Sequence, residues 1–215
     1  MKINRHGLLL ILSGPAGAGK TTFARMLCDA EENCILSVSA TTRPARGNET
    51  DGEDYFFLSK SEFKKSISAG AFAEYAEFSG NLYGTPREFL EKTLEEGRHV
   101  VFDIEVKGAA QLGEAYPEAV KIFLLPPKPE ILVNRLLERK TDSREEVARR
   151  MEIARAEILH LKEYDYFIVN DNLETTFSAI QSILRAELHR VRGGEYEAWF
   201  DGRDPEEILK VDSDD

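Results

Sequence analysis

Apolar runs alternate along the chain with segments in which hydrophobic residues recur every three or four positions. Residues 8–12 are apolar without interruption and end at Ser13 and Gly14, which predicts a strand buried on both faces of a parallel sheet. Further strands are predicted at residues 35–39, 55–58, 72–78, 99–104, 120–124 and 166–169. Helices are predicted at residues 21–28, 59–69, 87–96, 129–139, 143–162 and 173–191, with an alanine-rich helix that ends near residue 116.

Local polar signals mark the boundaries of these elements. Ser59 with Glu62, and Ser143 with Glu146, have the spacing of a capping box and predict the first turns of two helices. Residues 41–54 form a polar loop, and residues 79–86 are rich in turn-forming residues, so no strand is expected at either place.

The strongest chemical signal is the sequence Gly-Pro-Ala-Gly-Ala-Gly-Lys-Thr at residues 14–21. It fits G-x-x-x-x-G-K-[ST] between a predicted strand and a predicted helix, a context that disfavours an ordinary glycine-rich turn. Backbone amides and the helix dipole can hold phosphate oxygens there, Lys20 can reach the β- and γ-phosphates, and the Thr21 hydroxyl can bind Mg²⁺. The residues expected to bind ATP are Gly14, Pro15, Ala16, Gly17, Ala18, Gly19, Lys20, Thr21 and Thr22.

Core strands that alternate with helices indicate an α/β fold: a three-layer, P-loop NTPase-type parallel sheet with helices on both faces. The P-loop core is expected to comprise residues 1–40 and 98–192, with a short lid at about residues 136–150. Residues 41–97 carry shorter strands and are expected to form an inserted small α+β domain. An acidic tail follows at residues 193–215.

Two carboxylates lie at the carboxyl end of the predicted strand 99–104, the edge at which open α/β sheets bind ligands. Asp103 and Glu105 are two residues apart, so they project to the same side if the strand continues. Asp103 could hold Mg²⁺ directly or through water, as the acidic residue of a Walker B strand does. Ordinary carboxylates at a strand end are the alternative.

Two arginine clusters suit phosphate groups. Arg43 and Arg46 lie in the loop 41–54, where their planar guanidinium groups could bind phosphate oxygens in pairs, although a solvated loop is an equally good reading of these residues alone. Arg135 and Arg139 share one helix face, and Arg150 lies in the next predicted helix. These three could belong to a lid that closes over a transferring phosphoryl group, or they could pair with neighbouring glutamates.

The composition of the chain limits the classes of partner that it is expected to bind. The 215 residues carry a formal charge of -11, of which the nine acidic and two basic residues from 195 onwards supply -7. Binding nucleic acid or an anionic membrane would call for a broad basic face, so neither is expected. Cys28 and Cys34 fit no disulfide or zinc pattern, and no apolar run has membrane-spanning length, which favours a cytoplasmic protein. The sequence leaves open whether it is a monomer or a homodimer.

With these motifs in view, the chain resembles the guanylate kinase family from about residue 8 to residue 190. The resemblance rests on GPAGAGKTT at 14–22, SVSATTRPARG at 37–47, DGEDYFF at 51–57, FAEYAEFSGNLYGT at 72–85, the strand ending at Asp103, RLLERKTDS at 135–143 and IVND at 168–171. It implies an enzyme that moves the γ-phosphate of ATP, bound with Mg²⁺, onto GMP and also dGMP, for guanine nucleotide biosynthesis and salvage.

The resemblance also implies roles in GMP binding. Glu74 would accept hydrogen bonds from N1–H and N2–H of guanine, while a hydroxyl of Ser39 or Thr85 serves O6. Asp103 and Glu105 would belong to the same site. The residues implied to clamp the GMP phosphate are Arg43, Arg46, Tyr55 and Tyr83.

On the donor side, the resemblance implies that Asn170 meets the adenine of ATP. The chain departs from the family pattern at three positions: Glu105 replaces the usual aspartate, Lys107 a common glutamine and Lys140 a common glycine. The first departure could alter how guanine or a metal-bound water is held. None of them removes a charge that phosphoryl transfer needs.

A phosphate oxygen of GMP is already a nucleophile near pH 7, so no general base is expected. The residues expected to carry catalysis, by positioning and neutralising charge, are Lys20, Arg43, Arg135, Arg139 and Arg150. A guanylate-kinase-like protein-binding module is an alternative, but it should have lost P-loop or lid residues that persist here. A related sugar-phosphate kinase is a second alternative, although it would not need Glu74.

Overall fold

The computed structural model describes residues 7–78, 80–131 and 144–191, with side chains for all of these except residues 78 and 144–150. Its core is a five-stranded parallel sheet in the order β2-β7-β1-β8-β9. These strands are β1 (Leu9–Ser13), β2 (Cys34–Leu36), β7 (His99–Asp103), β8 (Val120–Leu125) and β9 (Tyr166–Val169). The α/β fold expected from the sequence is confirmed.

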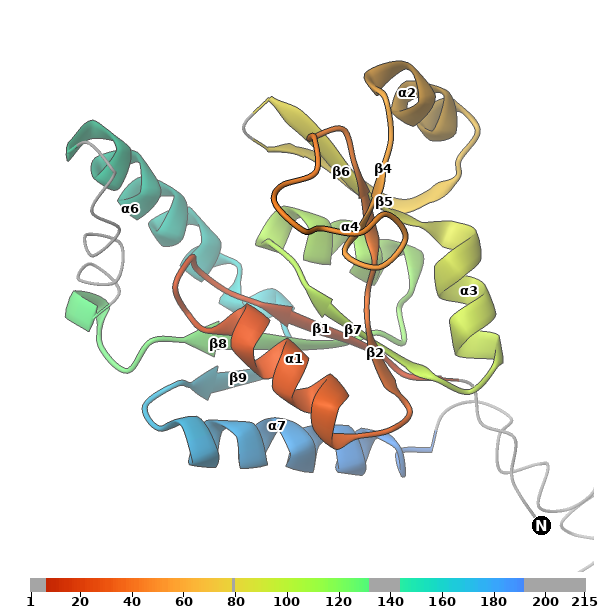
Figure 1. Ribbon diagram of the computed structural model, residues 1–215. Coiled ribbons are helices and arrows are strands. Elements are labelled where there is room, and N and C mark those ends of the chain that lie inside the picture. Colours follow the sequence, from red (N-terminus) through yellow and green to blue (C-terminus); the bar gives the residue numbers. More distant parts are fainter. Residues whose placement is uncertain (1–6, 79, 132–143, 192–215) are drawn as a thin grey trace, which may run out of the picture.

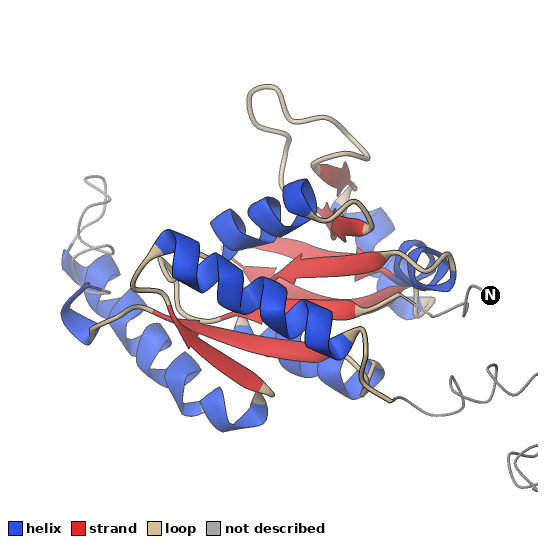
Figure 2. Cartoon of the chain, turned by 90° about the horizontal axis from the view of Figure 1, so that it is seen from below, coloured by secondary structure: helices blue, strands red, loops and turns tan. Residues whose placement is uncertain are grey.

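Helices cover both faces of this sheet (Figures 1 and 2). They are α1 (Lys20–Ala30) and α7 (Leu173–Glu187) on one face, and α3 (Arg87–Glu95) and α4 (Val106–Ala115) on the other. Strand β1 shows why the sheet is buried on both sides: Leu10 and Leu12 pack towards α1 and α7, whereas Leu9 and Ile11 pack towards α3 and α4. The unbroken apolar run of β1 therefore supplies both layers of the core.

A second, four-stranded sheet lies above the core in Figure 1, in the order β4-β3-β6-β5. Its strands are β3 (Ser39–Thr41), β4 (Tyr55–Phe57), β5 (Phe72–Phe78) and β6 (Asn81–Pro86), and α2 (Lys60–Ser68) packs on it. Phe63 of α2 stacks on Phe72 of β5 with 4.4 Å between ring centroids. The small sheet thus has a hydrophobic core of its own.

Two expectations in this region are wrong. Residues 35–39 do not form one strand, because the chain leaves the core sheet after Leu36 and enters the second sheet at Ser39. Residues 79–86 are not only a turn: residues 81–86 form β6, which pairs with β5 from Phe78↔Asn81 to Phe72↔Pro86. In both cases the partner strand, which local sequence patterns do not reveal, decides the structure.

The remaining elements are α6 (Arg144–Leu159), a short 3-10 helix at Leu161–Glu163, and the loop that leads into β9. The long helix predicted for residues 143–162 therefore ends earlier, at Leu159, and α7 ends at Glu187 rather than at 191. Most of the helix predicted for 129–139, the cap at Ser143 and the acidic tail lie outside the described residues. Among the described helices, none is long and apolar enough to cross a membrane.

The capping box at the start of α2 is confirmed. The Glu62 amide donates to Ser59 Oγ at 3.2 Å, and the Ser59 amide donates to Glu62 Oε2 at 2.8 Å. Each side chain satisfies a backbone donor that the first turn of a helix leaves free.

We expect Ser59→Ala to lower the free energy of unfolding by about 1 kcal/mol, because the Glu62 amide loses its acceptor. Urea unfolding monitored by circular dichroism measures this value. Ser68→Ala is the control, since the Ser68 hydroxyl bonds only to a carbonyl inside the helix. Equal losses in the two variants would contradict the capping role.

Candidate functional site

The glycine-rich loop between β1 and α1 is tightly packed against its surroundings. Gly14, Gly17 and Gly19 have positive φ angles of 137°, 86° and 99°. A Cβ at Gly14 would lie 2.3 Å from the Leu124 carbonyl oxygen, and one at Gly19 would lie 2.7 Å from Asn170 Nδ2. Gly14 is therefore required both for its backbone angle and for space, and Gly19 is favoured by its backbone angle.

Lys20 folds over this loop. Its ammonium group donates to the carbonyl oxygens of Gly14 at 2.7 Å and Pro15 at 3.4 Å. The side chain is thereby held above the loop at the N-terminus of α1, where backbone amides and the helix dipole favour anions.

The adjacent residue, Thr21, connects the loop to the neighbouring core strand. Parallel pairing sets Leu12 of β1 beside Asp103 of β7, and the Thr21 hydroxyl donates a hydrogen bond to Asp103 Oδ2. A hydroxyl and a carboxylate oxygen side by side are ligands that suit Mg²⁺. No cluster of three or more acidic, histidine or cysteine side chains that could hold a metal occurs among the described residues. A cation here would therefore take its other ligands from phosphate and water.

Asn170 approaches the same loop from the end of β9. Its amide hydrogen-bonds to the Leu125 carbonyl oxygen at 2.7 Å, and its side-chain Nδ2 donates to the Ala18 carbonyl oxygen at 2.8 Å. Asn170 thus contacts the glycine-rich loop on the side away from Asp103, where it helps to fix the loop's position.

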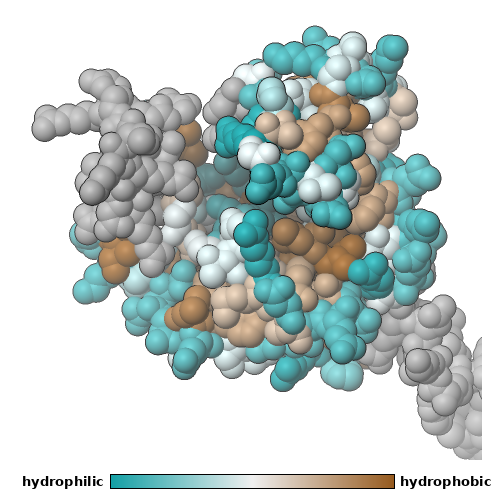
Figure 3. Space-filling view, viewed as in Figure 1, coloured by the Kyte–Doolittle hydropathy of each residue, from teal (hydrophilic) through white to brown (hydrophobic). Residues whose placement is uncertain are grey.

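A cavity of about 240 Å³ lies between the core and the second sheet. It brings together six of the residues predicted to bind the acceptor, which come from both sheets, and adds two charged residues that the sequence had not assigned to the site, Glu77 and Lys107. The six are Ser39, Tyr55, Glu74, Tyr83, Asp103 and Glu105. In the space-filling view the molecule is hollowed between its two parts (Figure 3).

Glu74 is a buried carboxylate in this cavity. Only 5% of it is exposed, and its Oε1 accepts a 2.8 Å hydrogen bond from the fully buried Thr85 hydroxyl. Burial raises the pKa of Glu74, and the bond from Thr85 offsets part of that rise. A Cβ at Gly108 would lie 3.3 Å from Oε2, so the glycine keeps space beside the second oxygen. That oxygen is suited to accept from a bound ligand.

Arg43 is nearly buried, with 7% exposed, and Glu49 holds it through two hydrogen bonds of 2.9 Å. The guanidinium also lies over the Tyr55 ring, 5.2 Å from its centroid. The pair with Glu49 raises the pKa of Arg43 above its usual value and lowers that of Glu49. Glu49 also accepts from the Arg46 amide at 2.7 Å, so one carboxylate orients this whole arginine loop.

Glu49 was not assigned to the site from the sequence. The only local signal for it is its position three residues after Arg46, a spacing that allows a contact within the loop. A second missed residue is Glu157 of α6, which lines a cavity of about 860 Å³ together with Glu105, Lys107 and His160. Burial raises the pKa of Glu157 to about 7, while the Lys20 charge lowers it and the Glu105 charge raises it. Glu157 thus lies within the electrostatic reach of the loop lysine.

The predicted lid arginines cannot be placed in the site. Arg135 and Arg139 lie outside the described residues. Arg150 lies on α6, in the part of that helix for which only the backbone is described. Thr22 is exposed in the first turn of α1, and Arg46 is exposed in the loop that leads into β4 and does not line the cavity.

A glycine-rich loop between the central strand and its helix, with a lysine over it and a threonine bonded to an aspartate on the next strand, defines a P-loop nucleotide-binding protein. The sequence model of the guanylate kinase family, described as "Guanylate kinase", matches residues 6–187. The chain therefore belongs to the guanylate kinase family.

Individual relatives agree. The chain is 44% identical over 191 residues to the guanylate kinase of Caldanaerobacter subterraneus subsp. tengcongensis, covering 89% of this chain and 93% of the relative. It is 47% identical over 202 residues to that of Rhizobium etli, covering 94% and 91%. The crystal structure of guanylate kinase from Anaplasma phagocytophilum superposes with a TM-score of 0.72 at 35% identity, covering 93% of this chain and 98% of that one.

We expect Glu74→Gln to stabilise the free protein at neutral pH. A raised pKa means that the folded state binds the proton more tightly than the unfolded state, so the charged form costs stability as pH rises above 4.5. Glutamine removes that charge and can still accept from Thr85.

Urea midpoints at pH 7 and pH 4.5 test this expectation. The variant should exceed wild type at pH 7, and the difference should shrink towards pH 4.5. Glu77→Gln, on the same strand but exposed, is the control. A variant less stable than wild type at pH 7 would contradict the burial cost assigned to Glu74.

Proposed function

We propose that this protein catalyses transfer of the γ-phosphate of ATP to GMP, and also to dGMP, giving ADP and GDP. The observation that carries the proposal is the buried Glu74–Thr85 pair in a cavity that shares Asp103 with the glycine-rich loop. The names of the relatives support the same activity.

Guanine suits this cavity by its hydrogen-bonding pattern. It presents N1–H and N2–H as neighbouring donors, and a charged carboxylate at Glu74 can accept from both. Its O6 is an acceptor, which the Ser39 hydroxyl can serve; Thr85, the other hydroxyl expected from the sequence, already donates its one proton to Glu74. Adenine has an acceptor at N1, which would face the Glu74 carboxylate and leave both unpaired.

For the donor, residues 14–22 would bind the phosphates of ATP and Asn170 would lie towards its adenine. The oxygen ligands at Thr21 and Asp103 fit Mg²⁺, which these two residues would hold together with phosphate oxygens. When bound, Mg²⁺ neutralises charge on the β- and γ-phosphates. Lys20 would turn from the carbonyl oxygens of the loop to those same phosphates.

The acceptor phosphate would be clamped by Arg43, Arg46, Tyr55 and Tyr83. Because Glu49 already fixes Arg43 in the free protein, little side-chain entropy remains to be lost on binding. The phosphate oxygen of GMP is itself the nucleophile, so the residues act by alignment and by neutralising charge rather than by removing a proton. We propose that Arg135, Arg139 and Arg150 add charge from a lid at about residues 136–150.

We also propose which part of the chain binds each nucleotide. Residues 1–40 and 98–192 would form the ATP-binding core, and residues 41–97 the GMP-binding insertion. ATP and GMP are the proposed small-molecule partners. A cytoplasmic location, and a monomeric or homodimeric state, stay predictions from the sequence.

A steady-state screen of GMP, dGMP, AMP, UMP and sugar phosphates as acceptors tests the proposed function. We expect GMP and dGMP to be used with far higher kcat/KM than the others. Preference for a sugar phosphate would replace the proposal. The absence of turnover with every acceptor would favour a protein-binding module.

We expect Lys20→Met to lower kcat by about 10³-fold while the protein stays folded, because charge stabilisation at the transferring phosphoryl group is lost. A coupled assay of ADP release measures kcat, and circular dichroism checks folding. Lys92→Met, an exposed lysine on α3, is the matched control. Near wild-type turnover in Lys20→Met would contradict the mechanism.

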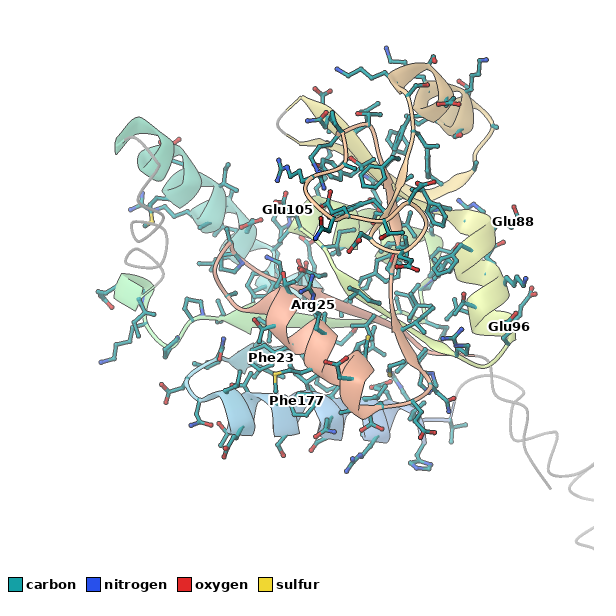
Figure 4. All side chains as sticks on the ribbon, viewed as in Figure 1. Phe23, Arg25, Glu88, Glu96, Glu105 and Phe177 are labelled. Atoms are coloured by element: carbon teal, nitrogen blue, oxygen red, sulfur yellow. The ribbon has the colours of Figure 1, made fainter. Side chains whose placement is uncertain are left out.

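We expect Glu74→Leu to weaken GMP binding by roughly 2 to 5 kcal/mol, because the guanine donors and the Thr85 hydroxyl are left unpaired. ATP affinity should barely change. Isothermal titration measures both affinities, with Glu88→Leu on the outside of α3 as the control (Figure 4). Unchanged GMP affinity would show that Glu74 does not bind guanine.

A further inference from the structure

Arg25 is a charged residue of the cleft to which no role has yet been assigned. It lies four residues after Thr21 on α1, so the two side chains share one face of the helix. Both line a second cavity, of about 290 Å³, whose opposite wall is the loop that leads into β4. In Figure 4 the Arg25 side chain is directed from α1 towards the insertion.

The charges in this cavity are unevenly distributed. Among the described residues that line the cavity, Arg25 is the only cation, beside four carboxylates. Three of the four have partners: Glu49 binds Arg43, Asp103 accepts from Thr21, and Asp54 accepts from the Thr50 amide at 2.8 Å. Within the described part of the chain, the Glu53 carboxylate and the Arg25 guanidinium make no hydrogen bond or ion pair. They are therefore unpaired opposite charges on facing walls.

Glu53 belongs to a hydrogen-bonded turn that couples its position to that of Tyr55. The Glu53 and Asp54 amides both donate to the Thr50 carbonyl oxygen, at 3.3 and 3.0 Å, and the Gly52 amide donates to the Tyr55 carbonyl oxygen at 2.8 Å. Tyr55, two residues after Glu53, lines both cavities and carries Arg43 on its ring. Movement of Glu53 would thus move part of the proposed phosphate clamp.

We propose that Arg25 is a positioning residue: as the cleft narrows around the acceptor nucleotide, Arg25 pairs with Glu53 and holds Tyr55 over the acceptor phosphate. The pairing offsets repulsion between the carboxylates of the loop and those of the core, which would otherwise oppose closure. The inference rests on the proposed function, because the acceptor is what draws the two walls together.

A charge swap tests the pairing. The variants Arg25→Glu and Glu53→Arg each place like charges on the two walls, and we expect each to raise KM for GMP about three- to tenfold, with a smaller change in KM for ATP. The double variant restores opposite charges and should return KM for GMP to within about twofold of wild type. Added salt should reduce the effect of the single variants.

Lys64→Glu on α2 is the matched control, because it makes the same charge change at an exposed position outside both cavities. Arg25→Gln and Glu53→Gln should raise KM for GMP in the same direction, but less. Thermal unfolding of each variant shows whether it is folded.

Rescue in the double variant would support the pairing. Additive losses in the double variant would overturn it, as would a double variant no better than Arg25→Glu, the result expected if Arg25 touched the acceptor phosphate directly. Unchanged kinetics in both single variants would overturn it as well. These outcomes all presuppose a wild-type enzyme that phosphorylates GMP; its inability to do so would instead refute the proposed function.

Discussion

The parallel pairing of β1 with β7 and β8 is the constraint on which the site depends. It fixes Leu12 beside Asp103 and Ser13 beside Phe123, so three strands end at one edge of the sheet. The glycine-rich loop begins at that edge with its first glycine against the Leu124 carbonyl, where any side chain would collide. The phosphate-binding loop and the nearby carboxylate thus take their positions from backbone pairing in the core.

The net charge of the chain opposes nucleotide binding, because a protein with a formal charge of -11 has to attract anionic nucleotides. Two of the described cations of the site are held locally: Lys20 by carbonyl oxygens of its own loop, and Arg43 by Glu49. Arg43 is thereby preorganised, with little conformational entropy left to lose, whereas Lys20 is kept at the loop where the phosphates would bind. Local arrangement, and not net charge, therefore makes nucleotide binding possible.

How much the sequence predicts depends on how local the determining interaction is. The strand at 9–13, the glycine-rich loop and the Ser59 capping box were predictable, because neighbouring residues decide them. The division of residues 35–39 between two sheets and the strand at 81–86 were not, because distant partners determine both. Grouping Glu74 with Asp103 in one cavity came from family resemblance; no spacing in the sequence indicates it.

The acceptor cavity is built by two sheets, and its shape therefore depends on their distance. Glu74 and Tyr83 belong to the second sheet, whereas Asp103 is at the end of the core strand β7, and the chain passes between the sheets after Leu36. A nucleotide that bridges both walls can draw the sheets together, while unpaired carboxylates on the two walls resist that approach. Burial of the Glu74 charge costs stability in the free protein, and under the proposed function the guanine donors would offset that cost on binding. Under the proposed function, recognition of the base and closure of the cleft would be one event, because a base that cannot pair with Glu74 would not draw the two walls together.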